Sequence, residues 1–255
     1  MSYALRSYEF WLTFYRRTWR GSVATSIVNP VFYLGALGIG LGTLVNKSGT
    51  TPDGVEYIAF VAPGVLAATA MQIATNEAMW PVLGSIRWTR GYYAMLATPL
   101  QIRHIVFGHQ AWMATRVVSS CAVYLAVIAA FGAIHSPLGV LALPACFLIG
   151  VAFSAPMAAY SATLENDAAF IVVNRFAVIP MFLFSGTFFP ISRLPQVLRW
   201  VAYLTPSWHG VDLCRSLTLG RVDWGLAVVH VAYLAALAVT GLVFALRTYR
   251  RRLMK

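Results

Sequence analysis

Residues 117–164 read VVSSCAVYLAVIAAFGAIHSPLGVLALPACFLIGVAFSAPMAAYSATL, and they contain no Asp, Glu, Lys or Arg. About 20 apolar residues suffice for one helical crossing of a bilayer. The stretch is therefore too long for a single crossing, and the turn-forming residues at 135–137 divide it into two. We expect a third span from near His104 to near Ile134, and a fourth span after the break.

The composition of the whole chain agrees with a membrane location. Hydrophobic residues make up 59% of the 255 residues and charged residues only 11%, whereas soluble domains contain about 45–50% apolar residues. The net charge of +11 does not indicate a nucleic-acid partner, because the basic residues flank apolar runs rather than gathering in one solvated patch. The sequence predicts a polytopic membrane protein.

Four further apolar runs predict an all-α integral membrane fold with six transmembrane helices in a single transmembrane domain, 1–255. The expected spans outside the opening stretch are 26–45, 57–80, 168–188 and 224–246. Gly38 and Gly42 in the first of them form a GxxxG pair, which permits close contact between helices.

The N-terminal residues 3–20 predict an amphipathic helix before the first span. Tyr8, Trp11, Tyr15 and Trp19 recur at steps of three and four residues and form an aromatic stripe. Such a helix lies in the plane of the lipid headgroups. The alternative is an ordinary cytosolic lead-in helix.

Lys and Arg are distributed unevenly between the two sides that six spans would define. Most of them lie before the first span, in the island at 81–103, or after the last span. Because cytoplasmic loops carry an excess of Lys and Arg, both termini are expected in the cytoplasm of a multi-pass protein.

The segment 81–100 is too polar to span a membrane and too apolar for a free loop. Arg, Trp and Tyr are enriched at protein interfaces, so a short cytoplasmic helix here would suit docking onto another protein. The residues expected to make this contact are Arg87, Trp88, Arg90, Tyr92 and Tyr93. The alternative is a helix that rests on lipid headgroups.

Five charged residues are expected near the cytoplasmic ends of spans: Glu77, Arg116, Glu165, Asp167 and Arg175. A charge at the centre of a bilayer costs roughly 2.5–3.5 kcal/mol on insertion scales. These groups either pair locally and reach toward water, or transmit movement from a cytoplasmic partner.

The segment 190–223 is amphipathic and is interrupted by Pro195 and Pro206. Neither side of Pro206 is apolar enough to cross a membrane alone. We expect a pair of short helices that dip into the membrane or lie on its face.

Motifs for enzymatic chemistry are absent from the sequence. It contains no HExxH zinc pattern, no GxSxG elbow and no phosphate-binding GxxxxGK[ST] loop. The chain is therefore not expected to be an enzyme or to hydrolyse ATP by itself. The spacing of Cys121, Cys146 and Cys214 predicts neither a disulfide nor a metal site, and His104 and His109 share no helical face.

Two segments resemble the permease subunits of type-2 ABC exporters. Residues 94–100, AMLATPL, resemble the end of the coupling-helix region of that family. Residues 184–190, FSGTFFP, with Leu194-Pro195 and Leu204-Thr205-Pro206, resemble the end of its span five and its extracellular re-entrant hairpin. His209, Asp212 and Arg215 continue the pattern, and the sequence is most similar to nodulation lipo-oligosaccharide and drug-resistance export permeases.

The resemblance has two local departures. Close relatives often carry Trp-Glu where Tyr92-Tyr93 stand, and Gly-Glu where Gly108-His109 stand. Glu77 matches an acidic position of the family.

The resemblance implies an exporter permease in the bacterial inner membrane. Two such chains, identical or paralogous, would form the pathway for an amphipathic, lipid-linked or glycolipid-like molecule or a hydrophobic drug. Two copies of a separate ABC ATPase subunit would bind ATP and Mg, and would receive the coupling helix. The residues expected near the outer end of the pathway are Phe182, Phe184, Phe188 and Phe189; those of the hairpin are Pro190, Pro195, Pro206, His209, Asp212 and Arg215.

Three other functions remain open from the sequence. An ion-coupled secondary transporter would place an acidic residue near the middle of the membrane, and none is evident. An intramembrane lipid-modifying enzyme would need converging catalytic residues, which the sequence does not show. A purely structural membrane subunit is the third alternative. Separately, the alternative to a pathway role for the four phenylalanines is simple lipid-facing bulk.

Overall fold

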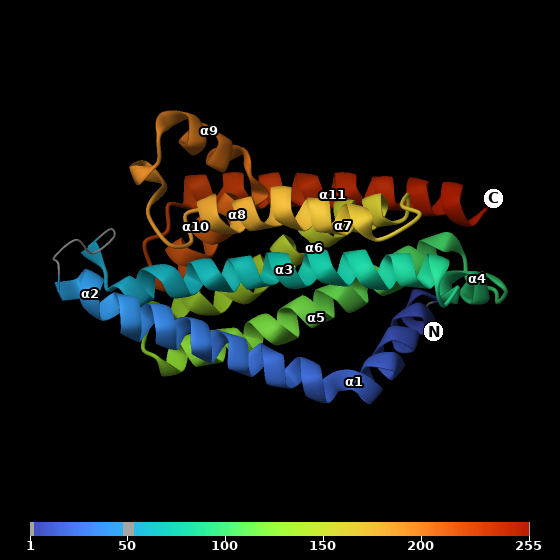
Figure 1. Cartoon of the computed structure of the whole chain (residues 1–255), viewed down its shortest axis with the longest axis horizontal. Coiled ribbons are helices and arrows are strands. Elements are labelled where there is room, and N and C mark those ends of the chain that lie inside the picture. Colours follow the sequence, from blue (N-terminus) through green and yellow to red (C-terminus); the bar gives the residue numbers. More distant parts are fainter. Residues whose placement is uncertain (1–2, 48–53, 255) are drawn as a thin grey trace.

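The computed structural model describes residues 3–47 and 54–254, and these residues form helices joined by turns. Four of the helical segments are long and apolar enough to cross a membrane. They are α3 (Tyr57–Arg87), α5 (Ile102–Ala130), α6 (Ala142–Ser161) with the 3₁₀ turn Pro137–Leu141 before it, and α11 (Trp224–Leu253). They lie side by side in a bundle (Figure 1), and their buried residues form the main hydrophobic core.

The N-terminal part is one helical path rather than two separate helices. Helix α1 runs from Tyr3 to Tyr33, continues as a π-helix from Leu34 to Leu41, and ends in α2 (Gly42–Lys47). The predicted boundary at residue 20 is therefore wrong as a helix end, although α1 is bent (Figure 1). Residues 48–53 of the following loop lie outside the described residues.

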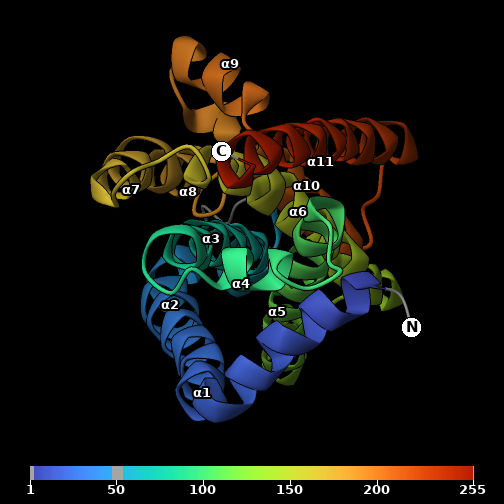
Figure 2. The same ribbon diagram turned by 90° about the vertical axis from the view of Figure 1, so that its right-hand side faces the viewer.

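The predicted fifth span is also divided by a π-helical turn. Helix α7 (Ala168–Val173) and α8 (Ile179–Phe184) flank the π-helix Asn174–Val178. These segments stand to one side of the bundle (Figure 2). They and Val31–Lys47 are apolar but shorter than the four long helices, so the count of six crossings stays a prediction.

The segment 81–100 divides differently from the prediction. The expected end of the second span near Trp80 is not a helix end, because α3 continues through Pro81 to Arg87. A proline inside a helix is tolerated where neighbouring groups satisfy the freed backbone. The separate short helix is only α4 (Gly91–Leu96). Both described ends of the chain lie at the same end of the bundle as α4 (Figure 1).

The expectation of two short helices in 190–223 is confirmed. Helix α9 (Gln196–Leu204) and α10 (Pro206–Leu219) meet at Thr205, after a short 3₁₀ turn at Ile191–Arg193. Helix α10 packs against α3, α6 and α11, whereas α9 projects away from the bundle (Figure 2).

Glycines bring three pairs of helices into close contact. A Cβ atom on Gly241 of α11 would lie 2.5 Å from Cδ of Pro156 in α6, and one on Gly108 of α5 would lie 2.5 Å from the Ala4 carbonyl oxygen of α1. The predicted GxxxG face contacts α3, since a Cβ on Gly38 would lie 2.6 Å from Ile58. Small residues permit this approach of backbones.

Candidate functional site

The turn between α3 and α4 is fixed by local hydrogen bonds. The Gly84 carbonyl accepts from the backbone N–H groups of Trp88 at 3.0 Å and Thr89 at 2.9 Å, which ends α3. Arg90 then takes a left-handed backbone conformation, with φ of 51°, directly before α4. Left-handed residues other than glycine are uncommon, and this one turns the chain back toward the bundle.

Four of the five residues expected to contact a partner lie on the surface of this turn. Arg87, Trp88, Arg90 and Tyr93 are exposed, and Trp88 is 60% exposed. Tyr92 is 0% exposed, so the expectation that it contacts a partner directly is wrong. Adjacent residues of an α-helix point about 100° apart, so Tyr93 faces outward while Tyr92 packs inward.

Tyr92 instead holds α4 against the long helices. Its hydroxyl lies 2.6 Å from Nδ1 of His109 in α5 and 3.3 Å from the Tyr249 hydroxyl in α11. Burial raises the pKa of the Tyr92 phenol well above its ordinary value, so the hydroxyl keeps its proton and can donate it to His109. Positions 92 and 109, two of the three at which the sequence departs from the resembled family, thus contact each other, while the third, Tyr93, faces outward.

The aromatic stripe of the N-terminal helix packs on the same cluster. The ring of Trp11 stacks on His109, with centroids 3.8 Å apart and an angle of 7° between the planes. Tyr8 and Tyr15 both contact Trp112 of α5. Three of the four stripe residues therefore face protein, and only Trp19 is exposed.

An ion cluster joins the ends of three segments beside α4. Glu165, in the turn between α6 and α7, lies 2.8 Å from Arg87 at the end of α3 and 2.5 Å from Arg252 at the end of α11. The cluster borders an open cavity of about 780 Å³. Its lining residues are Ile86, Arg87, Trp88, Arg90, Tyr93, Glu165 and Arg252.

A second ion pair joins α5 and α3, farther from α4 along the bundle. Nε of Arg116 in α5 lies 3.1 Å from Oε1 of Glu77 in α3, and both side chains are mostly buried. Arg116 also donates to the Tyr15 hydroxyl at 2.8 Å and lies over the Tyr15 ring. Local pairing thus accounts for Glu77, Arg116 and Glu165, and it connects α1, α3 and α5.

The other two expected charges are not part of these clusters. Asp167 and Arg175 are exposed on the α7 side of the molecule. Neither makes an ion pair with another residue that the structure describes.

The four phenylalanines expected near the outer end do not share one lining. Phe182 and Phe188 contact edge to face at 5.0 Å and pack against the main core. Phe184 is 39% exposed, and Phe189 packs with Ile191 and other residues of the hairpin.

The hairpin residues separate into backbone-shaping and polar groups. Pro190 and Pro195 precede the short helices, and Pro206 is the first residue of α10. Arg215 of α10 donates to the carbonyl oxygens of Phe60 at 3.0 Å and Gly186 at 2.7 Å. His209 and Asp212 point the other way, toward α11.

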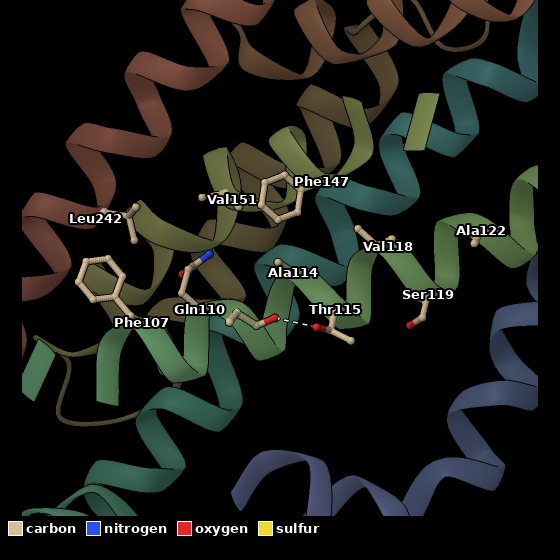
Figure 3. Close-up of a pocket in the computed structure, with 11 residues that line it drawn as sticks. Phe107, Gln110, Ala114, Thr115, Val118, Ser119, Ala122, Phe147, Val151 and Leu242 are labelled. Carbon is tan, nitrogen blue, oxygen red and sulfur yellow. Dashed lines mark hydrogen bonds between the residues drawn. The ribbon is translucent and has the colours of Figure 1, made fainter. Parts of the chain in front are cut away.

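An apolar groove of about 680 Å³ runs along the outside of α5 (Figure 3). Phe107, Ala114 and Val118 lie along α5, with Phe147 of α6 and Leu242 of α11 across from them. Its lining contains no charged residue. An apolar groove on a bundle of this composition suits contact with lipid chains.

The sequence did not predict the roles of several residues at the α4 end of the bundle. His104 caps α5, where its Nδ1 accepts from the Gln101 backbone N–H at 3.1 Å. His109 and Tyr249 partner Tyr92, and Arg252 partners Glu165. A histidine inside an apolar run, as at position 109, was the available signal for a buried polar contact.

Comparison with known proteins places most of the chain in one family. The family model described as ABC-2 type transporter matches residues 8–219. This range contains the turn at α4, the Arg116–Glu77 and Arg87–Glu165 ion pairs, and helices α9 and α10 of the hairpin, whereas Arg252 lies outside it.

Relatives match over nearly the full length. Nodulation protein J of Rhizobium leguminosarum bv. viciae is 33% identical over 253 residues, which cover 96% of this chain and 95% of the relative. Nodulation protein J of Sinorhizobium fredii is 31% identical, over 96% and 94% of the two chains. The protein of the same name from Bradyrhizobium diazoefficiens is 29% identical over the same shares.

Proposed function

Because the chain belongs to the ABC-2 type transporter family, we propose that it is the permease subunit of an ATP-driven exporter. A separate ABC ATPase subunit, in two copies, binds Mg and ATP and hydrolyses it. Two permease chains, identical or paralogous, enclose the pathway. The cargo is an amphipathic molecule, lipid-linked or glycolipid-like, or a hydrophobic drug.

The exposed surface around α4 is the observation that carries this proposal. Arg87, Trp88, Arg90 and Tyr93 surround an open cavity at one end of the bundle. Aromatic residues and Arg dominate the energetics of protein interfaces. Behind this surface, Tyr92 and Glu165 connect α4 and its neighbours to α5 and α11. Movement of a docked ATPase would thus reach two long helices directly.

Topology follows from the same proposal. The chain crosses the bacterial inner membrane six times, with α4 and both termini in the cytoplasm and the hairpin of α9 and α10 on the outer side. Lipids surround the bundle, and no nucleic acid takes part. The shared end of α4 and the termini supports this arrangement (Figure 1).

Copurification with the ATPase encoded nearest to this gene tests the docking surface. We expect Arg87→Glu combined with Trp88→Ala to reduce recovery of the ATPase at least tenfold and to abolish export. Arg193→Glu is the matched control, because Arg193 is an exposed arginine at the opposite end. Undiminished recovery with the double variant would refute the assignment.

Labelling of single cysteines tests the topology independently. Thr89 and Ser192 are exposed at opposite ends of the bundle. A membrane-impermeant maleimide applied to intact spheroplasts should label Ser192→Cys and should label Thr89→Cys only after lysis. The reverse pattern would overturn the proposed orientation. The native Cys121, Cys146 and Cys214 are buried, which keeps the background low.

A further inference from the structure

A buried chain of polar side chains joins the hairpin to the last long helix, at the end of the bundle opposite α4. Nδ1 of His209 in α10 lies 2.7 Å from Nδ1 of His230 in α11. Nε2 of His230 lies 3.0 Å from Oδ2 of Asp212 in α10. His209 and His230 are 6% and 1% exposed, whereas the Asp212 side chain is 34% exposed.

Aromatic rings enclose the two imidazoles and extend the contact to α9. His209 stacks on Tyr233 of α11, with centroids 4.0 Å apart, and Trp208 meets both imidazoles edge to face. The Tyr233 hydroxyl donates to the Leu204 carbonyl at 2.6 Å, at the end of α9. The cluster therefore fastens both helices of the hairpin to α11.

A small cavity of about 260 Å³ with several charged residues in its lining lies beside these polar side chains. Asp212 and His230 both line it, so water and protons have access to the carboxylate and to one imidazole. The remaining lining residues are Arg215, Ser216, Leu219, Arg221, Asp223, Leu226 and Ala227.

The geometry limits how many protons the pair of histidines can hold. Two Nδ1 atoms at hydrogen-bond distance need one proton between them. With Nε2–H of His230 donating to Asp212, the pair is either neutral, with His209 donating to His230, or singly charged, with His230 donating to His209. When both rings are fully protonated, two N–H groups and two charges face each other, and the bond between α10 and α11 is lost.

We propose that His209 and His230 form a proton-binding site that latches the hairpin to α11, and that acidification of the outer medium releases the latch. That this end of the bundle faces the outer medium rests on the orientation proposed above. The latch itself does not depend on the ATPase or the cargo. Its release frees α10, and with it the Arg215 contacts to α3, so the outer end of the pathway responds to pH.

Few charged or titratable groups surround the pair of histidines. Helix α6 and helix α8 contain no charged residue, and the charged residues of α3, Glu77 and Arg87, lie toward the α4 end. The groups that face the site from its own surroundings are Asp212, Arg215, Tyr203, Tyr233, Arg221 and Asp223.

The direction of the pH effect follows from burial. Burial, with His230 acting in the same direction, lowers the pKa of His209 to about 4, from an ordinary value near 6.5. A group with a lowered pKa binds fewer protons in the closed state than in the open state. Acidification below about pH 6.5 therefore favours opening, and the effect levels off only below about pH 4.

Hydrogen exchange of the full chain in nanodiscs tests the latch without ATPase or cargo. Peptides from α10 are followed between pH 7 and pH 4.5, with rates corrected for intrinsic exchange. The two pKa values predict a rise in the opening equilibrium on the order of twenty-fold between pH 7 and pH 5. Peptides from α5 should show no such rise.

Three variants separate the latch from general loss of structure. His230→Asn and His209→Gln should each remove the pH dependence of α10 exchange. His135→Gln should retain it, because His135 is an exposed histidine that contacts α10 only through its backbone N–H, which donates to the Thr218 carbonyl at 2.9 Å. A flat wild-type profile overturns the proposal even if a variant fails to fold, and so does a wild-type profile in His230→Asn.

Discussion

The two ends of the bundle each hold short helices against the long ones, and they use charge in different ways. At the α4 end, the arginines point outward around a cavity and the buried anchor is the neutral Tyr92. At the hairpin end, Arg215 points inward to backbone carbonyls, and two histidines are buried beside Asp212.

This difference between the two ends indicates that they have different roles. Outward cations with an aromatic neighbour are available to a partner surface and cost little when the partner is absent. An inward cation that satisfies buried carbonyls is part of the structure, because unmade hydrogen bonds inside a protein are expensive. The α4 end is therefore suited to docking and the hairpin end to closure.

The largest effect on stability is expected when Arg215 is replaced, and it tests whether inward and outward arginines differ. Arg215→Leu leaves the Phe60 and Gly186 carbonyls without this donor and removes the contact with the Phe60 ring. We expect a loss of about 3 kcal/mol in the free energy of unfolding, measured by thermal unfolding in nanodiscs. Arg193→Leu, which removes an exposed arginine of the hairpin, should change it by less than about 0.5 kcal/mol. Equal effects would remove the distinction between inward and outward arginines.

A smaller effect is expected at the anchor of α4. Tyr92→Phe keeps the packing of the ring but removes the hydroxyl that meets His109 and Tyr249. The free energy of unfolding should fall by about 1 kcal/mol, and ATP hydrolysis by the complex should lose part of its dependence on cargo. Tyr93→Phe is the control, because Tyr93 is on the exposed face. If Tyr93→Phe proves the more destabilising, the inward face of α4 has been assigned to the wrong residue.

The smallest effect on stability is expected for the outward ion cluster. Glu165→Gln removes the partner of Arg87 and Arg252, but the cluster is exposed. The expected change in the free energy of unfolding is at most about 1 kcal/mol, and it should shrink further at high salt. Binding of the ATPase is the sensitive readout, because two arginines lose their common partner. A large loss of stability that salt does not reduce would place this cluster in the core.

The sequence predicted the hairpin well because its signals are local. Pro195 and Pro206 fix the starts of α9 and α10 regardless of what surrounds them. By contrast, the polar composition of the segment from Pro81 onward did not indicate that α3 continues through it to Arg87. A local proline signal therefore located helix starts, whereas a change of composition did not locate a helix end.

The sequence predicted which segment forms the candidate site, but not which of its side chains face inward. The segment around Arg87 and Trp88 was recognisable from composition, whereas the inward face of Tyr92 depends on α5 and α11. The aromatic stripe with Trp11 illustrates the same limit, since an apolar face that packs on protein has the same spacing as one that lies on lipid. Partners distant in sequence, such as Tyr249 and His230, left no local signal.

The close approach of Gly241 to Pro156 has a mechanical consequence. Proline cannot move out of the way by a change of rotamer, and even a methyl group at position 241 would collide with its ring. Helices α6 and α11 are thus packed too closely at this point to move independently of each other. We therefore expect any helix movement during transport to occur at the π-helical turns 34–41 and 174–178, a type of turn that is frequent at functional sites, rather than between α6 and α11.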